Sequence, residues 1–129
     1  MATQAQRLSR HADTLASALA EQATAALLAE ARLTPKPGLV DGRGSGAHQD
    51  LTLALMERSA RALQPTFHAL ALHSWRRPAD VALRQQVGEL GRSGEAQMMA
   101  ATQGVNTHRG AIWALGLLVS GAAMLDGKA

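Results

Sequence analysis

Apolar residues recur at helical spacing along most of the chain. In residues 6–32, Leu8, Leu15, Leu19 and Leu27 stand four, seven or eight positions apart, so a helix would carry them on one face. The same periodicity predicts further helices over residues 50–63, 65–73, 79–90, 95–102 and 107–125.

The composition favours an all-α fold of about six helices. The chain has 27 Ala and 19 Leu but one Ile, one Phe and no Tyr among its 129 residues. Alanine and leucine favour helices, whereas β-branched and aromatic residues favour strands. Gly91 and Gly94 are expected to separate the fourth helix from the fifth, because glycine weakens helices. The length fits one domain, so we expect a single helical domain over residues 1–129.

Charge, hydropathy and cysteine content exclude several classes of protein. Thirteen Lys and Arg residues against ten Asp and Glu form no long basic run, which argues against nucleic-acid binding. The longest uncharged run, Gly110–Leu125, has 16 residues, whereas a membrane span needs about 20. The absence of Cys excludes disulfides, Cys-ligated zinc and thiol catalysis. We therefore expect a cytoplasmic protein that binds neither nucleic acid nor membrane.

Residues 34–48 interrupt the helical pattern with two prolines and four glycines, which predicts a polar loop. Loops of this length in compact domains are usually functional or disordered. Lys36 stands between the two prolines, and Arg43 lies beside Gly44 and near Gly46. Because backbone N–H groups next to glycines can approach an anion closely, this loop is suited to bind phosphate groups.

Two carboxylates and a histidine add to this loop. Asp41 and Asp50 could share a Mg²⁺ ion with phosphate oxygens. His48 lies at the start of the predicted second helix, where the helix dipole favours phosphate. The set suits a metal–triphosphate. The alternative is a flexible loop whose charges are incidental, since neither the P-loop nor the dinucleotide-binding pattern is present.

A second polar stretch precedes the last predicted helix. Asn106 or Thr107 is expected to cap that helix. His108 suits a general acid or a phosphate ligand, and Arg109 suits a phosphate clamp. Glu95, at the start of the predicted fifth helix, is a candidate third carboxylate for the same pocket. The alternatives are helix capping with solvated His108 and Arg109 and, for Glu95, a favourable charge in a first helical turn.

The two polar stretches contain three motifs in order along the chain. They are TPKPGLVD at 34–41, GAHQD at 46–50 and GVNTHRGAI at 104–112, with Glu95 and Met98 between the second and the third. Together they resemble the triphosphoribosyl-dephospho-coenzyme A synthases that serve citrate lyase and malonate decarboxylase. Residues 75–99 are more similar to the malonate decarboxylase branch. Gly44-Ser45 stands where the family often has asparagine, and Arg109 where lysine is common.

The resemblance implies an all-helical transferase. It would move the 5-triphosphoribosyl group of ATP onto the ribose 2′-hydroxyl of 3′-dephospho-coenzyme A and release adenine. The product is the precursor of the prosthetic group that an acyl-carrier subunit later receives. Family members are longer than 129 residues, so the chain is expected to match their N-terminal portion. Such an incomplete part of a larger helical domain would expose apolar surface, which favours self-association into a homo-oligomer.

The candidate residues can be assigned to this reaction as hypotheses. Breaking an N-glycosidic bond develops positive charge on the sugar, and a base must accept the proton of the incoming hydroxyl. Asp50 or Asp41 would meet one of these needs while the other holds Mg²⁺, with Glu95 as a further ligand. His48 or His108 would assist the departure of adenine. The nucleotide-binding residues would be Lys36, Arg43, Gly44, Gly46, Asn106, Thr107 and Arg109.

Two other functions compete with this interpretation. The first is a catalytically silent Mg-nucleotide-binding or scaffold module, which would keep the phosphate loop without the acceptor site. The second is a phosphate-ester hydrolase that uses the Asp and His cluster. The products separate them, because the transferase releases adenine, the hydrolase releases phosphate and the silent module releases neither.

Overall fold

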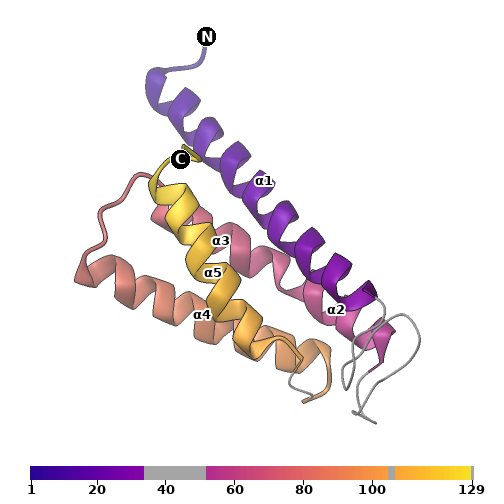
Figure 1. Cartoon of the computed structure of the whole chain (residues 1–129). Helices are drawn as coiled ribbons and strands as arrows, with labels where there is room; N and C mark the ends of the chain where they lie inside the picture. Colours follow the sequence, from indigo (N-terminus) through magenta and orange to yellow (C-terminus); the bar gives the residue numbers. More distant parts are fainter. Residues whose placement is uncertain (34–51, 105–106, 129) are drawn as a thin grey trace.

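The computed structural model describes residues 1–33, 52–104 and 107–128. The helices are α1 (Gln4–Arg32), α2 (Leu53–Ala62), α3 (Gln64–Ser74), α4 (Val81–Ala101) and α5 (Arg109–Met124) (Figure 1). No strand occurs in these three ranges, which confirms the predicted all-α class. In the same ranges no helix is long and apolar enough to cross a membrane.

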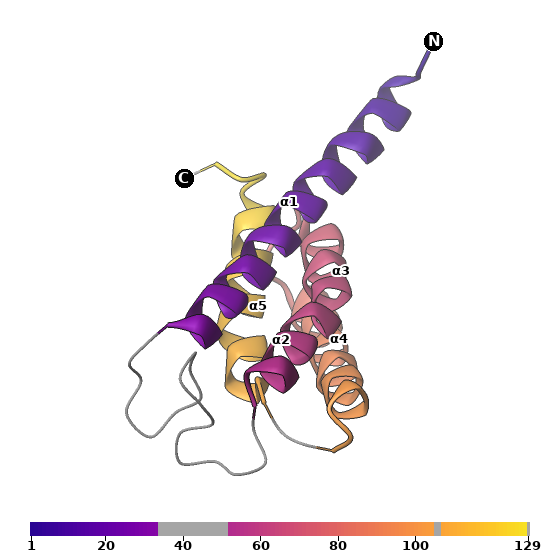
Figure 2. The ribbon, with the colours of Figure 1, turned by 90° about the vertical axis from the view of Figure 1, so that its right-hand side faces the viewer.

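Helix α3 lies at the centre of the bundle and packs against α1, α4 and α5, an arrangement that can be followed in Figure 2. Its Phe67 and Leu70 are buried, and Met98 from α4 and Ile112 from α5 belong to the same core. The face that α1 adds to this core is mostly alanine, which lets the long helix lie close to α3. The high alanine content therefore serves close packing as well as helix formation.

Three of the helices begin at a side chain that caps their first turn. Thr3, Thr52 and Asp80 each accept a hydrogen bond from a backbone N–H in the first turn of α1, α2 and α4. Such caps satisfy N–H groups that have no partner within the helix. The second helix was predicted from residue 50, and the structure instead starts it at Leu53, after the cap at Thr52.

Helix α4 corrects the prediction of two short helices separated by glycines. It runs without a break through Gly91 and Gly94, so the described residues form five helices rather than about six. A Cβ atom at Gly91 would lie 2.6 Å from the Trp113 ring, and one at Gly94 would lie 2.6 Å from Thr66 Cγ2. These glycines therefore allow α4 to approach α5 and α3, and they do not end the helix.

Substituting Gly94 by alanine tests this explanation. We expect Gly94→Ala to lower the free energy of unfolding by about 1–3 kcal/mol, because overpacking displaces Thr66 or the helix. Gly88 on the same helix is the matched control, since a Cβ there would meet only the flexible end of Arg92, at 3.2 Å. Gly88→Ala is expected to stabilise by about 0.5–1 kcal/mol through helix propensity. Denaturant unfolding measures both, and equal effects would contradict the packing explanation.

A partly buried carboxylate joins three distant segments at the end of the bundle that carries the C-terminus of α5. Asp126 accepts hydrogen bonds from Trp75 Nε1 at 2.7 Å and from Arg76 Nη2 at 2.7 Å. His11 of α1 contacts the same carboxylate through Nε2 at 2.8 Å. The hydrogen bonds from Arg76, then Trp75, then His11 hold the pKa of Asp126 well below its ordinary value. The ionised carboxylate therefore ties α1, the α3–α4 connection and the end of α5 together.

This lowered pKa predicts how stability depends on pH. The folded-state pKa of Asp126 lies below the ordinary value of 3.8, so its stabilising contribution is complete above that pH. The contribution is lost as the pH falls below 3.8 towards the folded-state pKa. We expect thermal unfolding of the parent chain to show a loss of stability in this acid range. Asp126→Asn should be less stable than the parent at neutral pH and should lose less stability on acidification. Glu21→Gln, at an exposed carboxylate on α1, should leave the profile unchanged, and an equal loss in both variants would exclude Asp126 as the cause.

Candidate functional site

The helix ends that border the two polar stretches lie at one end of the bundle. α1 ends and α2 begins on either side of residues 34–51, and α4 ends and α5 begins on either side of residues 102–108. Figures 1 and 2 show these four ends together. Side-chain hydrogen bonds join α1 to α2 and α2 to the start of α5. The fold thus brings together the helices that flank motifs far apart in the sequence.

Eight of the predicted site residues lie outside the described residues. They are Lys36, Asp41, Arg43, Gly44, Gly46, His48, Asp50 and Asn106. The predicted site residues that the structure describes are Glu95, Thr107, His108 and Arg109. Glu95 lies in the second half of α4, and the other three lie at the start of α5. They form two groups, one around His108 with Thr107 and one that pairs Glu95 with Arg109.

The first group centres on the imidazole of His108. This residue is 4% exposed, and its Nδ1 lies 2.7 Å from Oγ of Ser59, a fully buried residue of α2. The backbone N–H of His108 donates to Sδ of Met98 at 3.1 Å, and the hydroxyls of Ser59 and Thr107 hydrogen-bond to each other. The start of α5 is therefore fastened to α2 and α4 by buried polar contacts.

These contacts correct two expectations about this turn. His108 itself is the N-cap of α5 and makes no side-chain cap hydrogen bond. The capping prediction is therefore wrong for Thr107, whose hydroxyl bonds to Ser59, while Asn106 lies outside the described residues. The alternative of a solvated His108 is also wrong, because the side chain is buried. The physical reason is tertiary, since α2 offers these side chains polar partners that local sequence does not reveal.

Sequence reasoning missed Ser59 as a member of this site. It lies 49 positions before His108 in the chain, so no local motif contains both. One signal was present, because Ser59 stands between the apolar positions Met56 and Ala60 on the buried face of α2. Most buried hydroxyls have a hydrogen-bond partner, so a serine on an apolar face is a candidate for a contact with another part of the fold.

Removing the Ser59 hydroxyl should therefore destabilise the protein. Ser59→Ala leaves the Nδ1 of His108 and the hydroxyl of Thr107 without this partner, and we expect a loss of about 1–3 kcal/mol in unfolding free energy. Ser74 is a matched control, because it is equally buried and its hydroxyl has no hydrogen-bond partner within the described part of the chain. Ser74→Ala should be neutral or stabilising. Chemical denaturation measures the unfolding free energy of both variants. Equal losses would show that burial of the serine, and not its hydrogen bonds, determines the loss of stability.

The second group holds the guanidinium of Arg109 beside a carboxylate. Glu95 Oε1 accepts a hydrogen bond from Trp113 Nε1 at 2.7 Å, and its Oε2 lies 3.8 Å from Nε of Arg109. The Glu95 side chain is 23% exposed, whereas that of Arg109 is 54% exposed. Trp113 thus fixes the carboxylate, and the carboxylate in turn directs a cation that solvent and ligands can reach.

The partners of Glu95 bear on its prediction as a magnesium ligand. One carboxylate oxygen accepts from an indole, and the other faces a cation, whereas Mg²⁺ ligands are oxygens free to face the ion. No three His, Asp or Glu side chains gather within the part of the chain that the structure describes. The observed geometry suits Glu95 to orienting Arg109. Asp41 and Asp50 lie outside the described residues.

A third charged group lies where α1 ends against α2. Arg32 donates to both oxygens of Glu57, through Nε at 3.2 Å and Nη2 at 3.1 Å. Nη1 of Arg61 lies 3.6 Å from the same carboxylate. The hydrogen bond from Arg32 is the main cause of the lowered pKa of Glu57. Two guanidiniums share the Glu57 carboxylate here, and the pair with Arg32 holds the end of α1 against α2.

Comparison with known proteins identifies the family. Residues 16–129 match the model of the CitG family, described as ATP:dephospho-CoA triphosphoribosyl transferase. The matched range contains both polar stretches and every candidate site residue. No solved structure matches the chain.

Several curated proteins are similar to this chain. A 2-(5''-triphosphoribosyl)-3'-dephosphocoenzyme-A synthase of Klebsiella pneumoniae is 75% identical over 118 residues, which cover 92% of this chain and 42% of that protein. Probable synthases of the same name from Azotobacter vinelandii and Stutzerimonas stutzeri are 60% and 57% identical, over 85% and 95% of this chain and 38% and 42% of theirs. The chain therefore spans less than half the length of these relatives. By the family match, it belongs to the ATP:dephospho-CoA triphosphoribosyl transferase family.

Proposed function

We propose that this chain carries part or all of the site that transfers the 5-triphosphoribosyl group of ATP to the ribose 2′-hydroxyl of 3′-dephospho-coenzyme A. The bond from adenine to the ribose breaks, and its electron pair leaves with adenine. The acceptor oxygen forms the new bond, and its proton passes to a base. The observation that carries the proposal is the meeting of the helix ends that flank the motifs, with Arg109 presented there beside Glu95.

Arg109 is proposed to bind the triphosphate of ATP. Its guanidinium is more than half exposed and is oriented by a carboxylate held by Trp113, which suits charge-assisted hydrogen bonds to phosphate. Lys36 and Arg43 are proposed to bind the same triphosphate from the loop. Asp41 is proposed to hold Mg²⁺, which supplies countercharge to the phosphates when bound.

The proposed acid–base residues come from the first polar stretch. Asp50 is proposed as the residue that accepts the proton of the acceptor hydroxyl or stabilises the positive sugar, while Asp41 holds the ion. His48 is the preferred candidate to assist adenine, because Nδ1 of His108 already bonds to Ser59 within a buried cluster. His108 and Thr107 are instead proposed to hold the start of α5, and hence Arg109, in place.

The product is proposed to serve malonate decarboxylase rather than citrate lyase. The proposal rests on the resemblance of residues 75–99 to that branch, a range that includes most of α4 with Glu95. In this proposal a cytoplasmic enzyme makes the prosthetic-group precursor that is later attached to an acyl-carrier subunit. Comparing the attachment of the product to the acyl carriers of the two enzymes tests this choice.

Release of adenine is the decisive test of the reaction. The purified chain is incubated with Mg-ATP, with and without 3′-dephospho-coenzyme A, and the products are separated by chromatography with mass detection. Adenine that depends on the acceptor, together with a heavier coenzyme product, is the expected result. Mg-ATP binding without adenine would support the silent module, and phosphate in place of adenine would support a hydrolase.

A further inference from the structure

Helix α5 is apolar on all sides although part of it faces outward. Between Gly110 and Met124 it contains no charged residue. Ile112 and Val119 are buried in the core, whereas Leu117 and Leu118 are 61% and 69% exposed. A helix on the surface of a globular protein usually carries a polar outer face, and a helix that is apolar all round is usually buried. The outer face of α5 therefore has the character of an interior surface.

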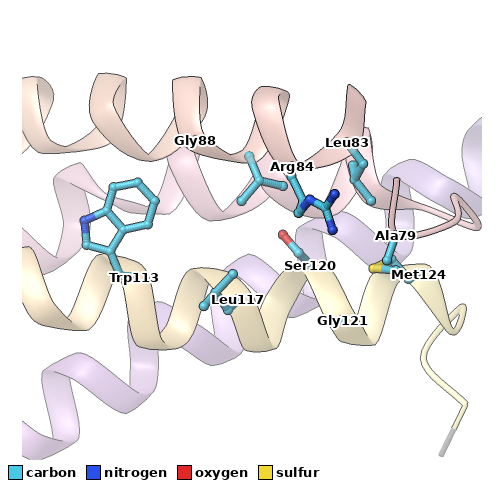
Figure 3. A pocket seen from close by; sticks show the side chains of 10 residues that line it. Ala79, Leu83, Arg84, Gly88, Trp113, Leu117, Ser120, Gly121 and Met124 are labelled. Atoms are coloured by element: carbon cyan, nitrogen blue, oxygen red, sulfur yellow. The ribbon is translucent and has the colours of Figure 1, made fainter. Parts of the chain in front are cut away.

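Grooves flank these two leucines on both sides. Between α4 and α5 lies a groove of about 320 Å³, whose walls include Leu83 and Val87 from α4 and Leu117 from α5. Figure 3 shows its side chains along the two helices, with Trp113 at one end and Met124 near the other.

The second groove lies on the α1 side of α5. It encloses about 200 Å³ and is lined by Leu19 and Ala26 from α1 and by Leu118 from α5. Leu117 and Leu118 thus form a ridge between two apolar grooves, and helices pack by seating ridges of side chains in grooves. We refer to Leu117, Leu118 and the two grooves as the α5 face.

We propose that the α5 face binds an apolar helix from the additional polypeptide that the relatives possess. The matched regions make up 42%, 38% and 42% of three relatives, so more than half of each relative is available to pack against this unit. Among the described residues that line the two grooves, Arg84 is the one that is charged, and burying an unpaired charge is costly. The bound helix should therefore present leucine, alanine or similar side chains to the face. This inference does not depend on the proposed reaction.

Co-production of the two polypeptides tests the proposal. The tagged chain is expressed together with the part of the Klebsiella pneumoniae relative that lies outside the matched region, and the recovered complex is quantified. We expect the two to copurify in equal amounts. Leu117→Glu with Leu118→Glu should reduce the copurified partner about tenfold or more, because two leucine burials are lost. Leu72→Glu is the control, since Leu72 is a 41% exposed leucine on α3.

The outcomes separate the possible occupants. Both leucines of the double variant are exposed, so circular dichroism should show a fold unchanged from that of the parent chain. Failure of the parent chain to capture the partner, or equal capture by the double variant, would overturn the proposal. Sedimentation equilibrium of the chain alone provides a second measurement. A dimer that the double variant abolishes would assign the α5 face to a second copy and would also overturn it.

Discussion

Replacing Asp50 by asparagine is expected to reduce acceptor-dependent adenine release by about 10²–10⁴-fold, the usual contribution of a positioned acid–base group. Asparagine keeps the size of the side chain but can neither accept the proton of the 2′-hydroxyl nor offer negative charge to the developing cation. The rate of adenine formation at saturating Mg-ATP and 3′-dephospho-coenzyme A measures the loss.

Two further variants make this result interpretable. Asp13→Asn removes an exposed carboxylate on α1 and should retain full activity. Asp41→Asn should lose activity in a way that higher Mg²⁺ concentrations partly restore, if Asp41 is the residue that holds the ion. Full activity of a folded Asp50→Asn variant would contradict the proposed role of Asp50 in the reaction. Rescue of Asp50→Asn by Mg²⁺, with none for Asp41→Asn, would exchange the two roles.

The all-α fold could be predicted because it depends on local properties of the chain. Apolar residues at helical spacing and the excess of alanine and leucine indicated each of the helices. The one error was to divide residues 79–102 into two helices, where the structure has the single helix α4. That error arose because glycine was interpreted by its weak helix propensity alone. At Gly91 and Gly94 the deciding factor is contact with Trp113 and Thr66, which lie on other helices and are distant in sequence.

The candidate site was predictable where motif residues are close in sequence to one another. Thr107, His108 and Arg109 were selected from their motif, and Glu95, predicted for the same pocket, lies 3.8 Å from Arg109 through its Oε2. Ser59 and Arg32 were not identified. Their roles arise from pairing across helices, with His108 and Glu57 respectively, and a single sequence without homologues holds little information on such pairs.

Replacing Arg109 by alanine should weaken the binding of Mg-ATP by about 10–100-fold, because hydrogen bonds to charged groups are each worth about 1.5–3 kcal/mol. Calorimetric titration with Mg-ATP measures this without requiring turnover. Arg10 is the control, since it is exposed and lies near the start of α1, whereas the opposite end of that helix borders the site. Arg10→Ala should bind Mg-ATP as the parent chain does. Arg109→Lys should fall between Arg109→Ala and the parent, because lysine keeps the charge but loses the planar donor geometry.

Glu95 provides a sharper test, because it has two candidate roles, orienting Arg109 and binding Mg²⁺. The two roles predict different affinities for a variant that combines Glu95→Gln with Arg109→Ala. Glu95→Gln can still accept from Trp113 but loses the charge that directs Arg109, so affinity should fall by a smaller factor than in Arg109→Ala. If Glu95 acts through Arg109, adding Glu95→Gln to Arg109→Ala should cause no further loss, since interacting residues are not additive. A further loss in the double variant would mean that Glu95 contacts the ligand or its Mg²⁺ directly. The magnesium-ligand role would then replace the orienting role that the observed geometry favours.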